Sequence, residues 1–66
     1  MKERKIMPYV TVKMLEGRTD EQKKALAEKI TVAVVETTGA PADRVHVMIE
    51  DMPKTNLSVG GKMANE

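Results

Sequence analysis

The sequence has no cysteine, tryptophan or phenylalanine, and only one histidine and one tyrosine among its 66 residues. Without cysteine the chain can form no disulfide and no thiolate metal site, and a single histidine cannot make a zinc site within one chain. The near absence of aromatic rings argues against a platform on which nucleic-acid bases stack. These absences remove the usual staples of a small domain and leave oligomerisation as the expected source of extra stability.

A charge excess of one sign and a long apolar run are also missing. Eleven basic and ten acidic residues give a net charge of +1, far from the balance of a protein that binds a phosphate backbone. No apolar run approaches the roughly 18 residues of a membrane span, and the charged stretch at residues 2–5 precedes no secretory apolar region. We expect a soluble cytoplasmic protein with neither a nucleic-acid nor a membrane partner.

The chain is predicted to hold one small domain at residues 8–66, preceded by an extension at residues 1–7. The extension is mostly charged and has neither periodicity nor turn chemistry. One interpretation is that it lies upstream of a working start at Met7. The other is that the protein retains it and has lost the chemistry of Pro8.

Two strands flanking a helix are predicted from the periodicity. Residues 9–15 and 44–51 alternate apolar and polar positions, as half-buried strands do. Between them, Thr19 and Gln22 have the spacing of a capping box, and Gly39 is placed to end a helix of about 19 residues near Thr38. The expected buried stripe of this helix is Leu26, Ile30, Ala33, Val34 and Thr37, and the expected solvent side is Lys23, Lys24, Glu28, Lys29 and Glu36.

The fold class that follows is α/β, a single βαβ unit with parallel strands and a right-handed crossover. Residues 57–59 are a candidate short strand, and Gly60-Gly61 predicts a hairpin or a bulge. One helix cannot cover both faces of a parallel sheet, which normally is buried on both. We therefore expect subunits to complete one another, at least as a dimer that joins two βαβ units into a larger sheet.

Four features occur in order: Met7-Pro8 opens a strand, residues 15–23 read LEGRTDEQK, residues 39–41 end the helix, and Val59-Gly60-Gly61 lies near the end of the chain. Together they resemble the 4-oxalocrotonate tautomerase (2-hydroxymuconate tautomerase) family from Met7 to about Lys62. The resemblance implies a cofactor-independent isomerase of aromatic hydrocarbon catabolism. It also implies a homohexamer, arranged as a trimer of dimers, that acts on a small carboxylate substrate.

Carried onto this chain, the resemblance makes Pro8 the general base and Arg18 a ligand of a substrate carboxylate. A free α-amino group suits base catalysis because its pKa of about 7.7 to 8.0 lies near the operating pH. In the chain as written, however, the nitrogen of Pro8 is part of the Met7-Pro8 amide and is not basic. The catalytic interpretation requires translation from Met7 or proteolysis before Pro8, and otherwise the chain is a non-catalytic scaffold capped by residues 1–7.

Two positions depart from the family pattern. His46 stands where that pattern has a second arginine, and Leu57 stands where the best-known members have phenylalanine. Arg44, predicted to share a strand face with His46, is an alternative ligand; His46 itself would be a weaker, pH-dependent one. Leu57 is expected to line the pocket. The superfamily also hydrates haloacrylates through the same proline, but no additional carboxylate is evident here that could activate water.

The order of the elements places Pro8 at one end of the first strand and Arg18 beyond the other. We therefore predict that the two residues share a site only when different copies of the chain supply them.

Overall fold

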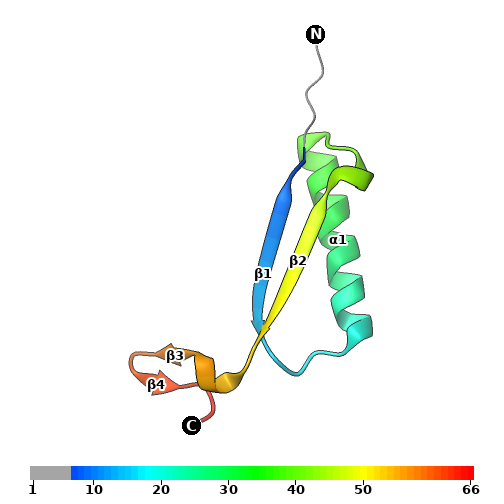
Figure 1. Cartoon of the computed structure of the whole chain (residues 1–66). Coiled ribbons are helices and arrows are strands. Elements are labelled where there is room, and N and C mark those ends of the chain that lie inside the picture. The colour runs from blue at the N-terminus through cyan, green and yellow to red at the C-terminus, as the bar shows by residue number, and fades with distance from the viewer. Residues whose placement is uncertain (1–6) are drawn as a thin grey trace.

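The computed structural model describes residues 7–66, so the predicted extension lies outside the described residues except for Met7. Its main body is a βαβ unit in which α1 packs against the pair β1 and β2, and a small hairpin projects from the opposite end to the N-terminus (Figure 1). The elements are β1 (Tyr9–Leu15), α1 (Asp20–Thr38), the 3₁₀ turn η1 (Ala42–Arg44), β2 (His46–Met52), the 3₁₀ turn η2 (Lys54–Asn56), β3 (Ser58–Val59) and β4 (Lys62–Met63).

β1 and β2 run parallel, in a register that begins at Tyr9 beside His46 and ends at Leu15 beside Met52. The predicted α/β class, with parallel strands joined through a helix, is therefore confirmed. The first strand has the predicted bounds, whereas the second starts two residues later than predicted because residues 42–44 form η1. The apolar residues Val10, Val12, Val47 and Ile49 are half-buried on alternate positions of the two strands.

Both predicted ends of the helix are confirmed. Thr19 and Gln22 form a complete capping box, and the helix that follows has 19 residues. Gly39 takes the left-handed conformation with φ of 81°, and its N–H donates to the carbonyl of Val35 at 3.0 Å. A glycine adopts this backbone conformation without a Cβ penalty. The sequence therefore sets the length of α1 through its caps.

The buried stripe of α1 is rotated relative to the prediction. Leu26, Ile30 and Val34 are half-buried as expected, but Ala33 and Thr37 are exposed in the single chain. Ala27, Thr31 and Val35 are half-buried in their place. Lys23, predicted on the solvent side, is half-buried because it reaches across to Asp51 of β2.

The segment after β2 forms the predicted hairpin. Gly60 and Gly61 have φ of 63° and 86°, the positive values that a two-residue type I′ turn requires at both positions. Antiparallel pairing joins Ser58 to Met63 and Val59 to Lys62. The returning strand Lys62–Met63 was not predicted, because so short a segment has too few residues to show alternation.

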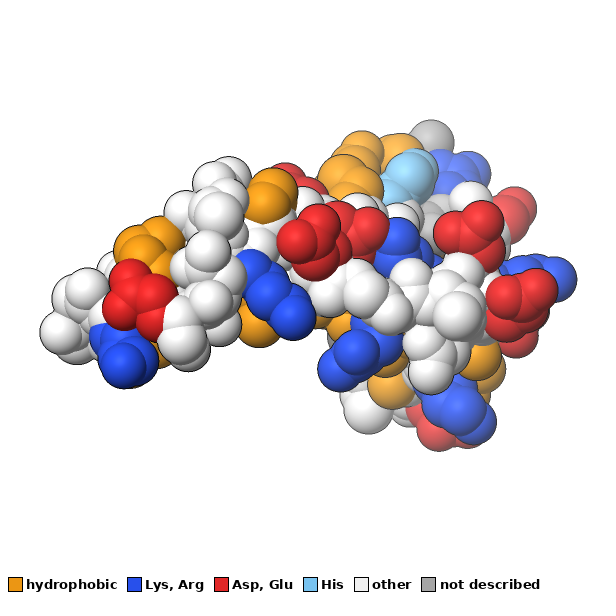
Figure 2. Space-filling model, turned by 90° about the horizontal axis from the view of Figure 1, so that it is seen from below, with side chains coloured by type: hydrophobic (Ala, Val, Ile, Leu, Met, Phe, Trp, Pro, Cys, Tyr) orange, Lys and Arg blue, Asp and Glu red, His pale blue; other side chains and the backbone are white. Residues whose placement is uncertain are grey.

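The single chain leaves much apolar surface uncovered. Among the described residues only Ala40 is buried, while Tyr9 and Val59 are 63% and 76% exposed. Figure 2 shows hydrophobic side chains at the surface in several separate places, over the body and over the projecting hairpin. No helix within residues 7–66 is long and apolar enough to cross a membrane. This exposure agrees with the expectation that other subunits complete the core.

Candidate active site

Pro8 lies immediately before β1 and is tied to the start of β2. Its carbonyl accepts a hydrogen bond from the backbone N–H of His46 at 3.0 Å, which extends the parallel ladder by one residue. As a proline within the chain, Pro8 has no backbone N–H. The ladder needs no donor here, because Pro8 precedes the strand and pairs through its carbonyl alone. Pro8 is half-buried. The backbone therefore brings Pro8 and His46 together.

The side chain of His46 stacks on Tyr9, its register partner. The two ring centroids are 4.6 Å apart and the planes differ by 18°. Nδ1 of His46 is buried and has no hydrogen-bond partner within the described part of the chain. A buried polar atom without a partner is uncommon in proteins. This end of the sheet therefore carries a histidine held by stacking, with one ring nitrogen unsatisfied.

Arg44 does not lie where the sequence predicted. It ends η1, and its N–H donates to the carbonyl of Pro41 at 2.9 Å, so it is part of a 3₁₀ turn and not of the strand. The premise that Arg44 and His46 share a strand face is wrong. Pro41 after the helix favours this turn, because proline fixes its own φ and lacks an N–H to continue a ladder.

Arg18 lies at the other end of β1, in the turn that leads to α1. Gly17 supports the turn with φ of 119°, a value that favours glycine. The N–H of Glu16 donates to the carbonyl of Met52 at 2.9 Å, so the turn begins directly at the end of the ladder. Arg18 itself is exposed. Its backbone is thus held on both sides while its guanidinium is accessible to a ligand.

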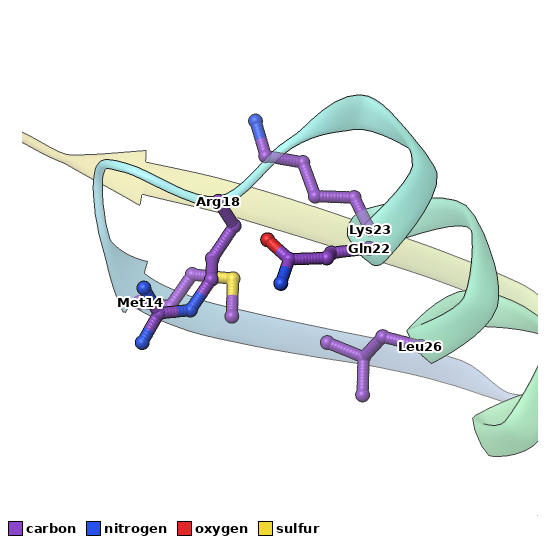
Figure 3. A pocket seen from close by; sticks show the side chains of 5 residues that line it. All are labelled: Met14, Arg18, Gln22, Lys23 and Leu26. Atoms are coloured by element: carbon purple, nitrogen blue, oxygen red, sulfur yellow. The ribbon is translucent and has the colours of Figure 1, made fainter.

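An open pocket of about 210 Å³ lies beside Arg18 (Figure 3). Two apolar side chains and three polar ones surround it, and none of the five is acidic. The lining residues are Met14, Arg18, Gln22, Lys23 and Leu26.

Lys23 is held by an ion pair with Asp51 across the first turn of α1 and the end of β2. The hydrogen bond that its ammonium donates to this carboxylate raises the pKa of Lys23 above its usual value. The charge of Lys23 is therefore already partnered within the chain, whereas Arg18 makes no ion pair among residues 7–66.

Leu57 lies between η2 and the hairpin, on the side of the molecule where β2 ends. It is half-buried, and its carbonyl accepts from the N–H of Ala64 at 2.9 Å. It is not among the residues that line the pocket of Arg18. Within one chain, Leu57 therefore contributes to the hairpin and not to that pocket.

Pro8 and Arg18 are placed at opposite ends of β1, as the sequence order requires. Seven strand residues separate them, which corresponds to about 23 Å at 3.3 Å per residue. Sequence reasoning did not identify Gln22 and Lys23 as pocket residues. The available signal was the capping box itself, which places Gln22 one turn after Arg18.

A model of the tautomerase enzyme family matches residues 8–66, and its match begins at Pro8. The chain is 67% identical over 60 residues to a Bacillus cereus protein named "Probable tautomerase", covering 91% of this chain and 98% of that protein. It is 60% identical over 60 residues to the 2-hydroxymuconate tautomerase of Bacillus subtilis, covering 91% and 97%.

Solved structures agree with these relatives. The crystal structure of YwhB, a homologue of 4-oxalocrotonate tautomerase, has a TM-score of 0.86 at 59% identity, covering 89% of this chain and 97% of that one. A heterohexameric 4-oxalocrotonate tautomerase from Chloroflexus aurantiacus has a TM-score of 0.86 at 35% identity, covering 91% and 97%. This chain therefore has the fold of the 4-oxalocrotonate tautomerases. The chain belongs to the 4-oxalocrotonate tautomerase family, within the tautomerase superfamily.

Proposed function

We propose that this protein is a cofactor-independent tautomerase that ketonises unsaturated 2-hydroxy acids resembling 2-hydroxymuconate. The family membership and the relatives named 2-hydroxymuconate tautomerase support this reaction. The nitrogen of Pro8 removes the proton from the 2-hydroxyl oxygen of the dienol substrate. It then returns a proton to a carbon atom of the same substrate, and the product is the 2-oxo acid. The proposal requires a free nitrogen on Pro8, because an amide nitrogen has no basic lone pair.

Arg18 supplies the counter-charge. Its guanidinium pairs with a substrate carboxylate through two parallel hydrogen bonds and draws electron density away from the reacting carbons. Arg18 makes no ion pair among residues 7–66, so no existing ion pair has to be broken when it binds the substrate carboxylate. The pocket beside it is large enough for a carboxylate with part of its carbon chain.

One catalytic site is made by two chains in this proposal. The placement of Pro8 and Arg18 at opposite ends of β1 is the observation that carries it, since no rotation of side chains within one chain closes about 23 Å. The exposed face of the sheet and its unpaired edges offer surface for association. By analogy with the heterohexamer from Chloroflexus aurantiacus, we expect a hexamer, in this case of identical chains.

A second substrate ligand belongs at the Pro8 end. We favour His46 over Arg44 because the backbone of His46 is bonded to Pro8, whereas Arg44 lies in the preceding turn. The Nδ1 of His46 has no hydrogen-bond partner among residues 7–66, but it is buried, so the ring would have to turn before this atom could meet a ligand. Leu57 would close the site as an apolar wall from a hairpin of a neighbouring chain.

The test compares two chemically synthesised forms of the protein that differ by one residue, residues 8–66 and residues 7–66, so that no methionine removal converts one into the other. We expect the first to ketonise 2-hydroxymuconate and the second to be inactive, since Met7 converts the nitrogen of Pro8 into an amide. Acylation of the first form should abolish its activity. Equal ketonisation by both forms would exclude Pro8 as the base.

The alternative is a non-catalytic scaffold whose site is capped by residues 1–7. Its basis is chemical: while the Met7-Pro8 bond is intact, the nitrogen of Pro8 is an amide and cannot act as a base. Intact-mass spectrometry of protein from its native source separates the two. A mass of residues 8–66 supports the enzyme, whereas a full-length mass without ketonisation supports the scaffold.

A further inference from the structure

The side chain of Gln22 has two ends, and the capping box uses only one. The backbone N–H of Thr19 lies 2.9 Å from Oε1 of Gln22, and the N–H of Gln22 lies 3.1 Å from Oγ1 of Thr19. A backbone N–H can only donate, so the amide oxygen must be the atom that faces Thr19. The orientation of the amide is therefore determined, and its NH₂ group lies on the other side.

The free end of this amide belongs to the pocket of Arg18. Gln22 is one of the five lining residues, and Figure 3 shows its amide group extending from α1 beside Arg18, with the nitrogen on the side of Leu26 and Met14. The nitrogen makes no hydrogen bond within the described residues. The pocket thus presents a guanidinium and an amide NH₂, both of which only donate.

The remaining walls suit the rest of such a ligand. Met14 and Leu26 offer apolar surface to a carbon chain, and no acidic side chain lines the pocket to repel an anion. The ammonium of Lys23 is turned to Asp51, which leaves the guanidinium and the amide as the donors without an internal partner. Two donors together with two apolar side chains match a carboxylate attached to a short carbon chain.

We propose that Gln22 is a substrate-binding residue that acts with Arg18, its Nε2 donating to one oxygen of the substrate carboxylate. This inference rests on the proposed function and specifies how that site recognises its substrate. The capping box is then more than a helix start, because it holds the amide with its donor toward the ligand. A carboxylate is bound by two side chains of one chain before the base of another chain acts on it.

Four variants of the full chain test this role with adipate, a saturated six-carbon dicarboxylate that cannot tautomerise. Calorimetry should show adipate binding to the wild-type protein. Gln22→Met, which removes the donor without adding charge, should weaken binding about fivefold. Gln22→Glu keeps the capping oxygen but replaces the donor with a negative charge, so it should weaken binding at least about tenfold.

Two controls separate recognition from folding and from net charge. Thr19→Ala removes the other half of the capping box and lowers the melting temperature, yet it keeps the Thr19 N–H that orients Gln22. Its adipate affinity should stay within about twofold of wild type. Lys24→Gln makes the same one-unit change in net charge as Gln22→Glu from an exposed position outside the pocket lining, and should also stay within about twofold.

Adipate affinity in Gln22→Met within twofold of wild type would overturn the proposal, as would an equal loss in Thr19→Ala or an absence of adipate binding by the wild-type protein. Failure of the proposed function has a different signature. In that case the residue 8–66 form would not ketonise 2-hydroxymuconate, or would do so equally well after Pro8→Ala, while the dependence of adipate binding on Gln22 persisted.

Discussion

The two ends of the β1–β2 ladder differ in the chemistry that one chain places there. At the start of the strands lie Pro8 and the stacked pair Tyr9 and His46, and the carbonyl of Pro8 accepts a hydrogen bond from the N–H of His46. Among residues 7–66, no ion pair forms at this end. At the finish lie Arg18 and the ion pair of Lys23 with Asp51, around an open pocket. In our proposal the first end supplies the base and the second supplies the binding groups.

This difference explains why association and activity are coupled in our account. The seven-residue strand β1 is held in a parallel ladder with β2, and this ladder keeps the two ends of the strand apart. Pro8 and Arg18 therefore cannot meet within one chain. A neighbouring copy can bring the opposite end alongside. The apolar surface that the single chain leaves exposed provides a driving force for that contact.

The largest expected effect comes from the Pro8 end. In the residue 8–66 form, Pro8→Ala replaces a rigid secondary amine by a more mobile primary amine. General-base catalysis contributes about 10²- to 10⁴-fold, so we expect kcat for ketonisation to fall by about 100-fold or more. Adipate affinity should be unchanged, because in our proposal Pro8 moves the proton and binds neither carboxylate. A parallel loss of affinity would contradict the division of roles between the ends.

The next effect is at the Arg18 end. Arg18→Ala should cost about 2 kcal/mol of transition-state binding, or about 30-fold in kcat/KM, because a charged hydrogen bond to the substrate is lost. Arg18→Lys retains the charge without the planar fork and should recover part of that loss. Steady-state kinetics on 2-hydroxymuconate measures both variants. Identical losses in the Lys and Ala variants would argue against bidentate pairing.

A substitution at His46, near Pro8, is expected to have a smaller effect, an increase in affinity for the substrate. His46→Arg adds a permanent charge and a second fork next to the base, so it should lower KM for a dicarboxylate substrate about threefold to tenfold. A monocarboxylate of the same length serves as the control and should show little change. An equal improvement for both substrates would show that the gain is not recognition of a second carboxylate.

The smallest effect concerns stability and not catalysis. Lys23→Met removes the ion pair with Asp51 and should lower the melting temperature slightly, more than Lys24→Met, whose lysine is exposed and outside this pair. Because the pKa of Lys23 is raised in the folded chain, its contribution is complete below the unfolded value of about 10.4 and disappears as the pH rises through the folded value. Thermal melts from pH 7 upward should show the difference between wild type and Lys23→Met shrink once the pH rises above the unfolded value.

Much of the fold could be predicted because local chemistry determines it. The capping box at Thr19, the left-handed Gly39 and the alternation in both strands each act over a few residues, and each is observed in the structure. The separation of Pro8 from Arg18 followed from element order alone. These features need no knowledge of tertiary contacts.

The rest depended on contacts between distant residues. Lys23 is half-buried because Asp51, which is 28 residues later, faces it from β2. Arg44 lies outside the strand because the chain forms a 3₁₀ turn after Pro41. Gln22 lines a pocket only because the fold brings the start of α1 close to Met14 of β1. Ala33 and Thr37 fit the helical spacing of the predicted buried stripe, yet both are exposed in the single chain. Their spacing therefore did not predict burial within one chain.

The central claim is that one site takes Pro8 from one chain and Arg18 from another, and subunit complementation tests it most directly. Equal amounts of the Pro8→Ala and Arg18→Ala variants of residues 8–66 are unfolded, mixed and refolded together, and ketonisation is measured. Random assembly should give intact residues to about one quarter of the sites, since each is supplied independently by half of the chains. The double variant refolded with Arg18→Ala is the control and should regain nothing.

If the site is shared between chains, the co-refolded mixture should recover about one quarter of wild-type activity, well above the mean of the two variants refolded separately. If Pro8 and Arg18 of the same chain formed the site, every chain in the mixture would still lack one of them. Activity equal to that mean, in a mixture shown by native mass spectrometry to contain mixed assemblies, would contradict a site shared between chains.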